Sequence, residues 1–168
     1  MNERVERVDE HDRVLAVVSR SDAVRHRWPH RVATVVCRDT QGRTLVHRRP
    51  PSASRFPGHL NWMLGGAVGV GESYEAAAAR ELTKELGVLS TPAPLFKFLC
   101  AGVLGPYWLG LHETVVTGRI APDPAEIAWH AWLTESELRA LVRHEAFVPD
   151  AREAFDRYCA LRPRPPRP

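Results

Sequence analysis

Cysteine is scarce in this sequence. Only three occur, Cys37, Cys100 and Cys159, and they are too scattered to form a metal-binding pair. Because the few cysteines follow no pattern, the default expectation is a cytoplasmic protein, where thiols stay reduced. Lysine is scarcer still, since Lys84 and Lys97 are the only lysines among the 23 lysine and arginine residues.

Long apolar runs are absent as well. None approaches the ~20 residues of a membrane-spanning helix, and the charged N-terminus lacks the apolar stretch of a signal peptide. We therefore expect no membrane partner. The 168 residues, 44% of them apolar, contain no repeat or linker and fit one domain over 1–160. The ending 161–168, LRPRPPRP, is expected to be a disordered basic tail, because proline there sustains neither helix nor sheet.

The net charge is modest. It is formally +3, and the basic residues are dispersed outside the tail. A charge of this size could attract an anionic substrate but does not indicate nucleic-acid binding. The sequence does not fix the oligomeric state, and a homodimer stays open.

The most informative stretch is 66–88, GAVGVGESYEAAAARELTKELGV. Four glycines between 65 and 71 allow tight turns and a close approach of the backbone to a ligand. Ser73 is a plausible helix cap and Gly87 stands where a helix would end. The pattern predicts a helix over 73–86.

Glu81, Lys84 and Glu85 share one face of this helix, since they lie about a turn apart. Two carboxylates beside a loop rich in free N–H groups suit a hard divalent cation that also holds phosphate oxygens. Bound Mg²⁺ or Mn²⁺ could neutralise a diphosphate and activate the water that attacks it.

The same stretch resembles the Nudix box, G-x5-E-x7-R-E-U-x-E-E-x-G-U, where U is a bulky apolar residue. Eight of nine defined positions match with the spacing intact: Gly66, Glu72, Arg80, Glu81, Leu82, Glu85, Gly87 and Val88. The resemblance implies that Glu81 and Glu85 hold the metal and that one of them also activates water. It further implies that Arg80 and Glu72 brace helix and loop, and that Gly66 belongs to the substrate-binding turn.

The ninth position is Lys84, where the family has a glutamate. A cation there cannot bind a metal, and it could instead pair with Glu81. Three outcomes are open. Lys84 could turn outward so that fewer metals bind, its ammonium could replace one metal as a phosphate contact, or hydrolytic activity could be lost.

The resemblance extends over about residues 5–158 and is closest to the Nudix subgroup related to isopentenyl diphosphate isomerase. That type of isomerase has a catalytic cysteine in the strand before the glycine turn, whereas this chain has 61–64, NWML, there. Hydrolysis is therefore favoured over isomerisation.

Residues outside the box complete the predicted site. A further carboxylate would come from Glu126, in a loop, or Glu113, on a strand; Glu126 is favoured because loops carry catalytic groups more readily. Arg48 and Arg49 end a strand, so one can grip a phosphate while the other points away, and we assign Arg49 to the phosphate.

The remaining pattern predicts a mixed sheet between helices. Strands are expected over 5–8, 13–18, 31–38, 43–48, 60–65, 95–104, 107–117 and 128–133. Further helices are expected after a capping box formed by Thr134 and Glu137, and near 150–160. The order indicates an α/β/α sandwich, the Nudix fold. Most of the eight histidines are interpreted as structural. The aromatic residues Phe56, Trp62, Tyr107 and Trp108 could form a wall for a base or an isoprenoid, but the core is the favoured place for them.

The sequence thus predicts a metal-dependent Nudix hydrolase, with Mg²⁺ or Mn²⁺ as cofactor. Its partner would be a small phosphorylated molecule, a nucleoside-diphosphate-containing metabolite cleaved at its diphosphate linkage. Two alternatives stay open: hydrolysis of an isoprenoid diphosphate, and a Nudix-like binding module whose hydrolysis is weakened or lost.

Overall fold

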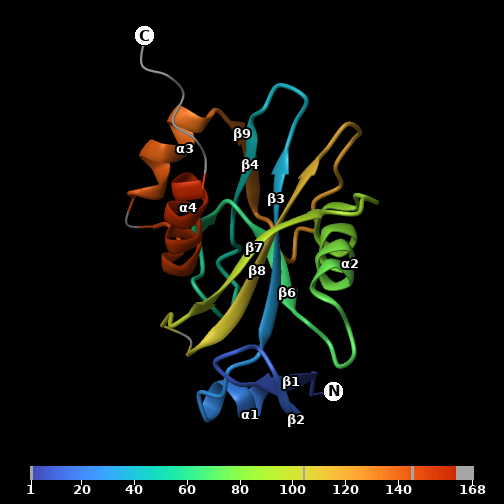
Figure 1. The fold of residues 1–168 in the computed structure, drawn as a ribbon. Helices are drawn as coiled ribbons and strands as arrows, with labels where there is room; N and C mark the ends of the chain where they lie inside the picture. The colour runs from blue at the N-terminus through green and yellow to red at the C-terminus, as the bar shows by residue number, and fades with distance from the viewer. Residues whose placement is uncertain (1, 104, 145, 162–168) are drawn as a thin grey trace.

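A mixed seven-stranded sheet forms the centre of the fold (Figure 1). The structure is a computed structural model that describes residues 2–103, 105–144 and 146–161. Its elements are β1 (Arg4–Val8), β2 (Val14–Ser19), α1 (Arg20–Arg25), β3 (Arg31–Arg38), β4 (Thr44–Arg48), β5 (Leu60–Asn61), β6 (Leu64–Ala67), α2 (Tyr74–Leu86), β7 (Ala93–Cys100), β8 (Tyr107–Val115), β9 (Trp129–Leu133), α3 (Glu135–Val142) and α4 (Pro149–Leu161).

Strand β3 lies in the middle of this sheet. It runs parallel to β8 along its whole length and antiparallel to β4 and β6, while β9 pairs with β4 and β7 with β8. Residues 33–37 of β3, ATVVC, are all buried, as expected for a strand covered on both faces. The sheet is therefore mixed, as the sequence predicted.

Helices cover both faces of the sheet, with α2 on one side and α3 and α4 on the other (Figure 1). On the α2 side, Leu82 and Leu86 pack with Val35. On the α4 side, Trp62 and Phe155 meet edge to face at 5.2 Å. The predicted α/β/α sandwich is confirmed, and Trp62 belongs to its core.

Helix α2 begins and ends where its caps predict. The Ser73 hydroxyl accepts a hydrogen bond of 3.1 Å from the Ala76 amide, and Gly87 adopts the left-handed conformation with φ 66°. The buried residues recur at helical spacing: Ala77, Ala78, Glu81, Leu82, Glu85 and Leu86. Two glutamates on the buried stripe set this helix apart from an ordinary amphipathic one.

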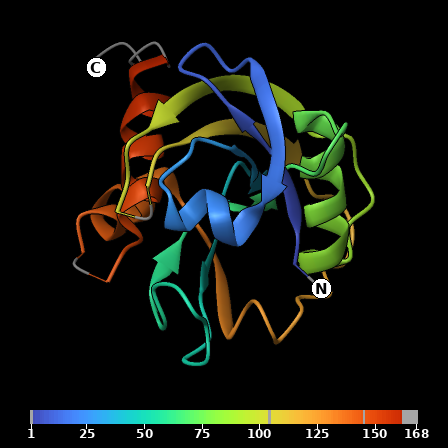
Figure 2. The ribbon, with the colours of Figure 1, turned by 90° about the horizontal axis from the view of Figure 1, so that it is seen from below.

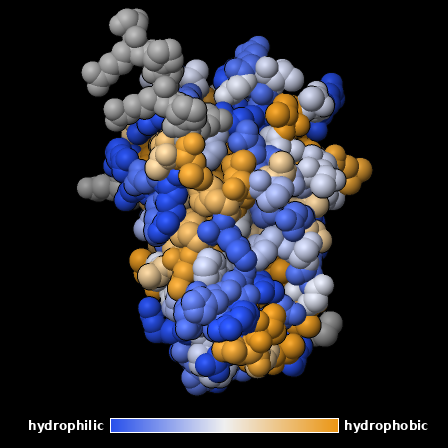
Figure 3. All heavy atoms as spheres, viewed as in Figure 1, coloured by the Kyte–Doolittle hydropathy of each residue, from blue (hydrophilic) through white to orange (hydrophobic). Residues whose placement is uncertain are grey.

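The N-terminal hairpin of β1 and β2, with α1, forms a separate layer across one end of the sheet (Figures 1 and 2). Helix α1 was not predicted; it begins at Arg20 and is capped by Ser19, whose hydroxyl accepts from the Asp22 amide. Strand β2 exposes Val14, Leu15 and Val17, and apolar atoms gather over this end of the molecule in Figure 3.

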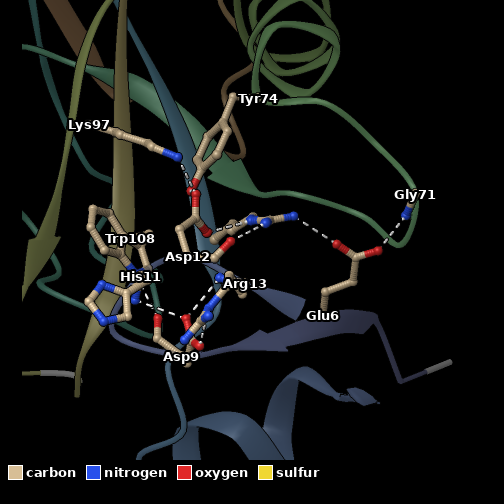
Figure 4. A network of polar contacts seen from close by, with 10 residues as sticks. Glu6, Asp9, His11, Asp12, Arg13, Gly71, Tyr74, Lys97 and Trp108 are labelled. Atoms are coloured by element: carbon tan, nitrogen blue, oxygen red, sulfur yellow. Dashed lines mark hydrogen bonds and ion pairs between the residues drawn. The ribbon is translucent and has the colours of Figure 1, made fainter. Parts of the chain in front are cut away.

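A buried carboxylate, Asp12, ties the hairpin to the rest of the fold (Figure 4). It accepts from Arg31 Nε at 2.6 Å, from Lys97 Nζ at 2.6 Å and from the Tyr74 hydroxyl at 2.9 Å. Tyr74 is the first residue of α2, so this network reaches the predicted box helix directly.

A second contact reaches the glycine loop. Glu6 on β1 pairs with Arg31 at 2.9 Å and accepts from the Gly71 amide at 3.0 Å (Figure 4). The N-terminal hairpin therefore holds both the loop and the start of the helix that carry the predicted site.

Several boundaries differ from the predictions; β7, for example, covers Ala93–Cys100 where a strand over 95–104 was expected. The expected strand 60–65 is two strands, because the Asn61 side chain accepts from the Met63 amide at 2.9 Å and turns the chain from β5, beside β4, to β6, beside β3. Leu161, placed in the predicted tail, is the last residue of α4, and 162–168 lie outside the described residues.

Within the described part, no helix is long and apolar enough to span a membrane.

Candidate functional site

A cavity of about 430 Å³ is lined by residues of α2 at one side and of α1 at another. All six residues of the predicted site line it: Arg49, Gly66, Glu81, Lys84, Glu85 and Glu126. They come from four separate segments, so the fold brings together what the sequence only suggested. These positions show proximity; the roles of the residues remain predictions.

Glu81 and Glu85 reach the cavity from successive turns of α2, and both are buried, at 4% and 6% exposure. Glu81 lies directly over Gly66 of β6, where a Cβ atom would stand 2.8 Å from the Glu81 carboxyl carbon. A side chain at position 66 would therefore displace Glu81. This close contact gives a physical reason for glycine at the start of the box.

Arg80 and Glu72 brace the loop and helix, as expected. Arg80 Nε lies 2.9 Å from Glu72 Oε1, and Glu72 Oε2 accepts from the Gly69 amide at 2.7 Å. Arg80 also donates to the Ala67 carbonyl and to Oε1 of Glu81. The guanidinium of Arg80 holds the pKa of Glu72 below its usual range. The brace thus engages Oε1 of Glu81 and leaves Oε2 without a contact to Arg80.

Lys84 turns toward the carboxylates instead of away from them. Its ammonium lies 3.7 Å from Glu81 Oε2 and 3.9 Å from Glu126 Oε1. The side chain is 54% exposed and lines the cavity, so it can meet a ligand bound there. Of the three outcomes that the sequence left open, an outward-facing Lys84 does not fit this geometry.

Glu126 approaches α2 from the loop before β9. That loop is fixed on the C-terminal end of the helix, because the amide of Ala121 donates to the Leu86 carbonyl and that of Asp123 to the Glu85 carbonyl, at 2.7 and 2.8 Å. Glu126 itself is about one-third exposed at the cavity wall.

The other carboxylate considered, Glu113, faces the opposite side of the sheet. It forms an ion pair of 3.0 Å with Arg38 and accepts from the Tyr158 hydroxyl of α4. Glu113 is therefore placed for a structural role.

The electrostatics of the carboxylate group favour a bound cation. Burial raises the pKa of Glu85 to about 8, and the negative charges of Glu81 and Glu126 add to this effect, while Lys84 opposes it. A divalent cation would relieve this repulsion, and carboxylate oxygens are its usual ligands.

Among the described residues, no three acidic, histidine or cysteine side chains converge as a ready-made metal cage. Mg²⁺ commonly uses one or two carboxylates together with waters and substrate phosphates, so Glu81 and Glu85 fit that mode of binding.

Arg49 and Arg48 point apart, as alternation predicted. Arg49 lines the cavity and donates to the Arg55 carbonyl at 2.7 Å, whereas Arg48 is exposed and stacks over Trp129. Arg49 is the one placed to meet a phosphate.

The opposite end of the cavity contains polar residues that the sequence did not single out, among them His30, Asp150 and Arg20. Tyr107 and Phe56 also line the cavity while they pack against the hydrophobic core, so they meet both interpretations that the sequence allowed. No spacing rule connects His30, Asp150 and Arg20, so only the fold shows that these polar residues lie beside the aromatic ones.

The fold and the glycine loop with its glutamate helix define a Nudix domain, and residues 28–158 match the NUDIX domain family. The chain belongs to the Nudix hydrolase family. It is 42% identical over 158 residues to an uncharacterised Nudix hydrolase of Streptomyces coelicolor, covering 92% of this chain and 87% of the relative. It is 32% identical over 154 residues to the uncharacterised Nudix hydrolase YfcD of Escherichia coli, covering 91% and 84%.

A solved structure supports the fold independently of these sequence matches. The crystal structure of DR0079 from Deinococcus radiodurans superposes with a TM-score of 0.79 at 33% identity, over 92% of this chain and 98% of that one. Nudix hydrolases generally use divalent metals, which agrees with the carboxylate group described above.

Proposed function

We propose that this protein is a metal-dependent hydrolase that cleaves the diphosphate linkage of a small, nucleoside-diphosphate-containing metabolite. The observation that carries the proposal is the meeting of Glu81, Glu85 and Glu126 in one cavity that also contains Arg49. The carboxylates would hold a divalent cation, and that cation and the arginine together would bind an anionic diphosphate.

Glu81 and Glu85 would hold Mg²⁺ or Mn²⁺. The cation would supply positive charge that stabilises the phosphate oxygens as the linkage breaks. Glu126, on the cavity wall, would accept a proton from the attacking water. Arg49 would orient the phosphate through paired N–H groups.

Lys84 would supply a positive charge from the protein itself, at a position where the family has a carboxylate. Its ammonium can contact a phosphate oxygen from the same side as Glu81 and Glu126. This role corresponds to the second of the three outcomes above, in which a lysine takes the place of one metal.

The test is a screen of the purified protein with Mg²⁺ or Mn²⁺ against nucleoside di- and triphosphates, dinucleotides and prenyl diphosphates. We expect the wild type to turn over at least one class of nucleotide. In Glu85→Gln we expect kcat to fall by about 10²-fold or more, because the variant loses a group that supports stabilisation of the transition state. Glu75→Gln is the matched control, because Glu75 is an exposed acidic residue on the same helix. Absence of turnover for every substrate would overturn the proposal.

The inward position of Lys84 supports a second candidate, a Nudix-like module that binds a phosphorylated ligand without cleaving it. Its ammonium occupies space next to Glu81 where a metal would bind. Nucleotide binding by calorimetry without any product, together with gain of turnover in Lys84→Glu, would favour this candidate over the hydrolase.

A further inference from the structure

The end of the cavity opposite the carboxylates is itself arranged to bind a ligand. Gly66, beneath Glu81, pairs with Ala33 of β3, and His30 lies three residues before Ala33 on the same chain segment. At ~3.3 Å per residue the two ends are therefore about 10 Å apart along β3. A diphosphate bound at Glu81 and Glu85 would place the group attached to it at this distal end.

His30 lines this distal end of the cavity, and its Nδ1 atom is buried. The residue is only 5% exposed. Burial lowers its pKa to about 4, an effect reinforced by Arg20, so the ring is neutral at physiological pH. The neutral ring therefore lines this end of the cavity without adding a positive charge to it.

Asp150 contributes a buried carboxylate to the same end. It is 6% exposed, stands in the first turn of α4 and accepts a hydrogen bond from the Tyr107 hydroxyl. Within the described residues, no ion pair neutralises it, unlike Asp12 in the hairpin network. A buried carboxylate is costly without hydrogen bonds, and its remaining acceptor capacity is available to a donor from a ligand.

Tyr107 joins these two residues. Its ring lies 6.2 Å from that of His30, and its hydroxyl is fixed by Asp150. The ring offers an aromatic surface for a flat ligand group, while Asp150 offers a polar contact at its edge.

We propose that His30, Tyr107 and Asp150 form a subsite for the nucleobase of a nucleoside diphosphate, and that Asp150 accepts a hydrogen bond from an N–H group of that base. This inference rests on the proposed function and specifies its substrate class. A prenyl chain in this place would remove water from the Asp150 carboxylate without offering it a hydrogen bond in return, which is unfavourable.

The experiment compares Asp150→Asn and Tyr107→Phe with wild type on nucleoside diphosphates and on isopentenyl diphosphate. Asp156→Asn is the matched control, because Asp156 lies on the same helix in an exposed ion pair with Arg143. We expect Asp150→Asn to raise KM for the preferred nucleotide about tenfold or more, the worth of one hydrogen bond to a charged group, while kcat changes by less than about threefold. Tyr107→Phe should raise KM in the same direction.

A purely structural role for Asp150 would lower the melting temperature without the selective change in KM, so thermal melts accompany the kinetics. Unchanged KM in Asp150→Asn, with turnover still lost in Glu85→Gln, would overturn the subsite and leave the hydrolase proposal intact. Preference of the wild type for isopentenyl diphosphate would also overturn it.

If the wild type hydrolyses nothing, calorimetry with the same compounds still decides the question. Nucleotide binding that weakens at least tenfold in Asp150→Asn, and not in Asp156→Asn, supports the subsite. Equal binding by both variants, or no nucleotide binding, overturns it.

Discussion

The ammonium of Lys84 lies 3.7 Å from a carboxylate oxygen of Glu81, one turn away on the same helix. Glu81 is buried, and its other oxygen accepts from Arg80, so Lys84 is placed at the oxygen that remains for a metal. A divalent cation bound there would meet electrostatic repulsion from this ammonium. The contact between Lys84 and Glu81 therefore controls how tightly the cavity binds metal cations.

Replacing Lys84 tests this competition. We expect Lys84→Glu to bind at least one more Mn²⁺ per chain, or the same number about tenfold more tightly, because it exchanges a repelling charge for a ligand. Lys84→Gln should give an intermediate affinity, since it removes the charge alone. Titration of Mn²⁺ followed by electron paramagnetic resonance measures both quantities without relying on turnover. Identical titrations for all three proteins would show that position 84 does not govern metal binding.

Glu85→Gln should stabilise the metal-free protein in a pH-dependent way. The pKa of Glu85 is about 8 in the folded state because of burial and the charges of Glu81 and Glu126, compared with an ordinary value near 4.5. For a group whose folded pKa is raised, stability is complete below the unfolded pKa and is lost as pH rises through the folded pKa. The wild type therefore loses stability between about pH 4.5 and 8, and the glutamine variant does not.

Thermal melts in a chelator at pH 5 and pH 8.5 measure this difference. The gain in melting temperature for Glu85→Gln should be larger at pH 8.5, and adding Mn²⁺ should raise the melting temperature of the wild type more than that of the variant. A gain of equal size at both pH values would contradict the raised pKa.

Arg48 and Arg49 offer a matched pair of substitutions. Arg49→Ala should raise KM about tenfold, the expected loss for one charge-assisted phosphate contact, because Arg49 lines the cavity. Arg48→Ala should leave KM within about twofold, because Arg48 is exposed and stacks on Trp129. Steady-state kinetics on the best substrate of the screen compares them. A larger effect from Arg48→Ala would reverse the assignment.

The parts of the fold that the sequence predicted correctly depend on local signals. Helix α2 was predicted because Ser73 and Gly87 cap it through neighbouring backbone groups, independently of the rest of the fold. The short helix α1 was missed because its six residues have no apolar periodicity of their own; only Ala23 of that helix is buried.

The site was predictable only at its box end. The spacing of the box placed Glu81 and Glu85, but strand alternation alone could not say which face of the sheet Glu113 would occupy. In the structure, Glu113 pairs with Arg38 and Glu126 lines the cavity, as the favoured choice required. Tyr107 and Asp150 meet across 43 residues of sequence with no motif between them, so only the fold shows their contact.

The Asp12 network predicts a stability effect far from the cavity. Burial raises the pKa of Asp12, but hydrogen bonds from Arg31, Lys97 and Tyr74 outweigh it and hold that pKa below its usual value. Removing one partner of a buried charge network typically costs ~3 kcal/mol or more. We expect Asp12→Asn to lower the free energy of unfolding by about this amount at pH 7, as measured by denaturant titration. Asp22→Asn, in an exposed pair with Arg25, is the control and should cost less than about 1 kcal/mol.

The sign of the pH dependence follows from the lowered pKa of Asp12. Its contribution is present above the unfolded pKa, near 3.9 for an ordinary aspartate, and is lost as pH falls through the lower folded value. The difference between wild type and Asp12→Asn should therefore narrow progressively below about pH 4. Because Asp12 contacts Tyr74 at the start of α2, the variant should also bind Mn²⁺ less tightly at pH 7. A stability difference that stays constant down to pH 2.5 would show that Asp12 does not supply its charge to this network.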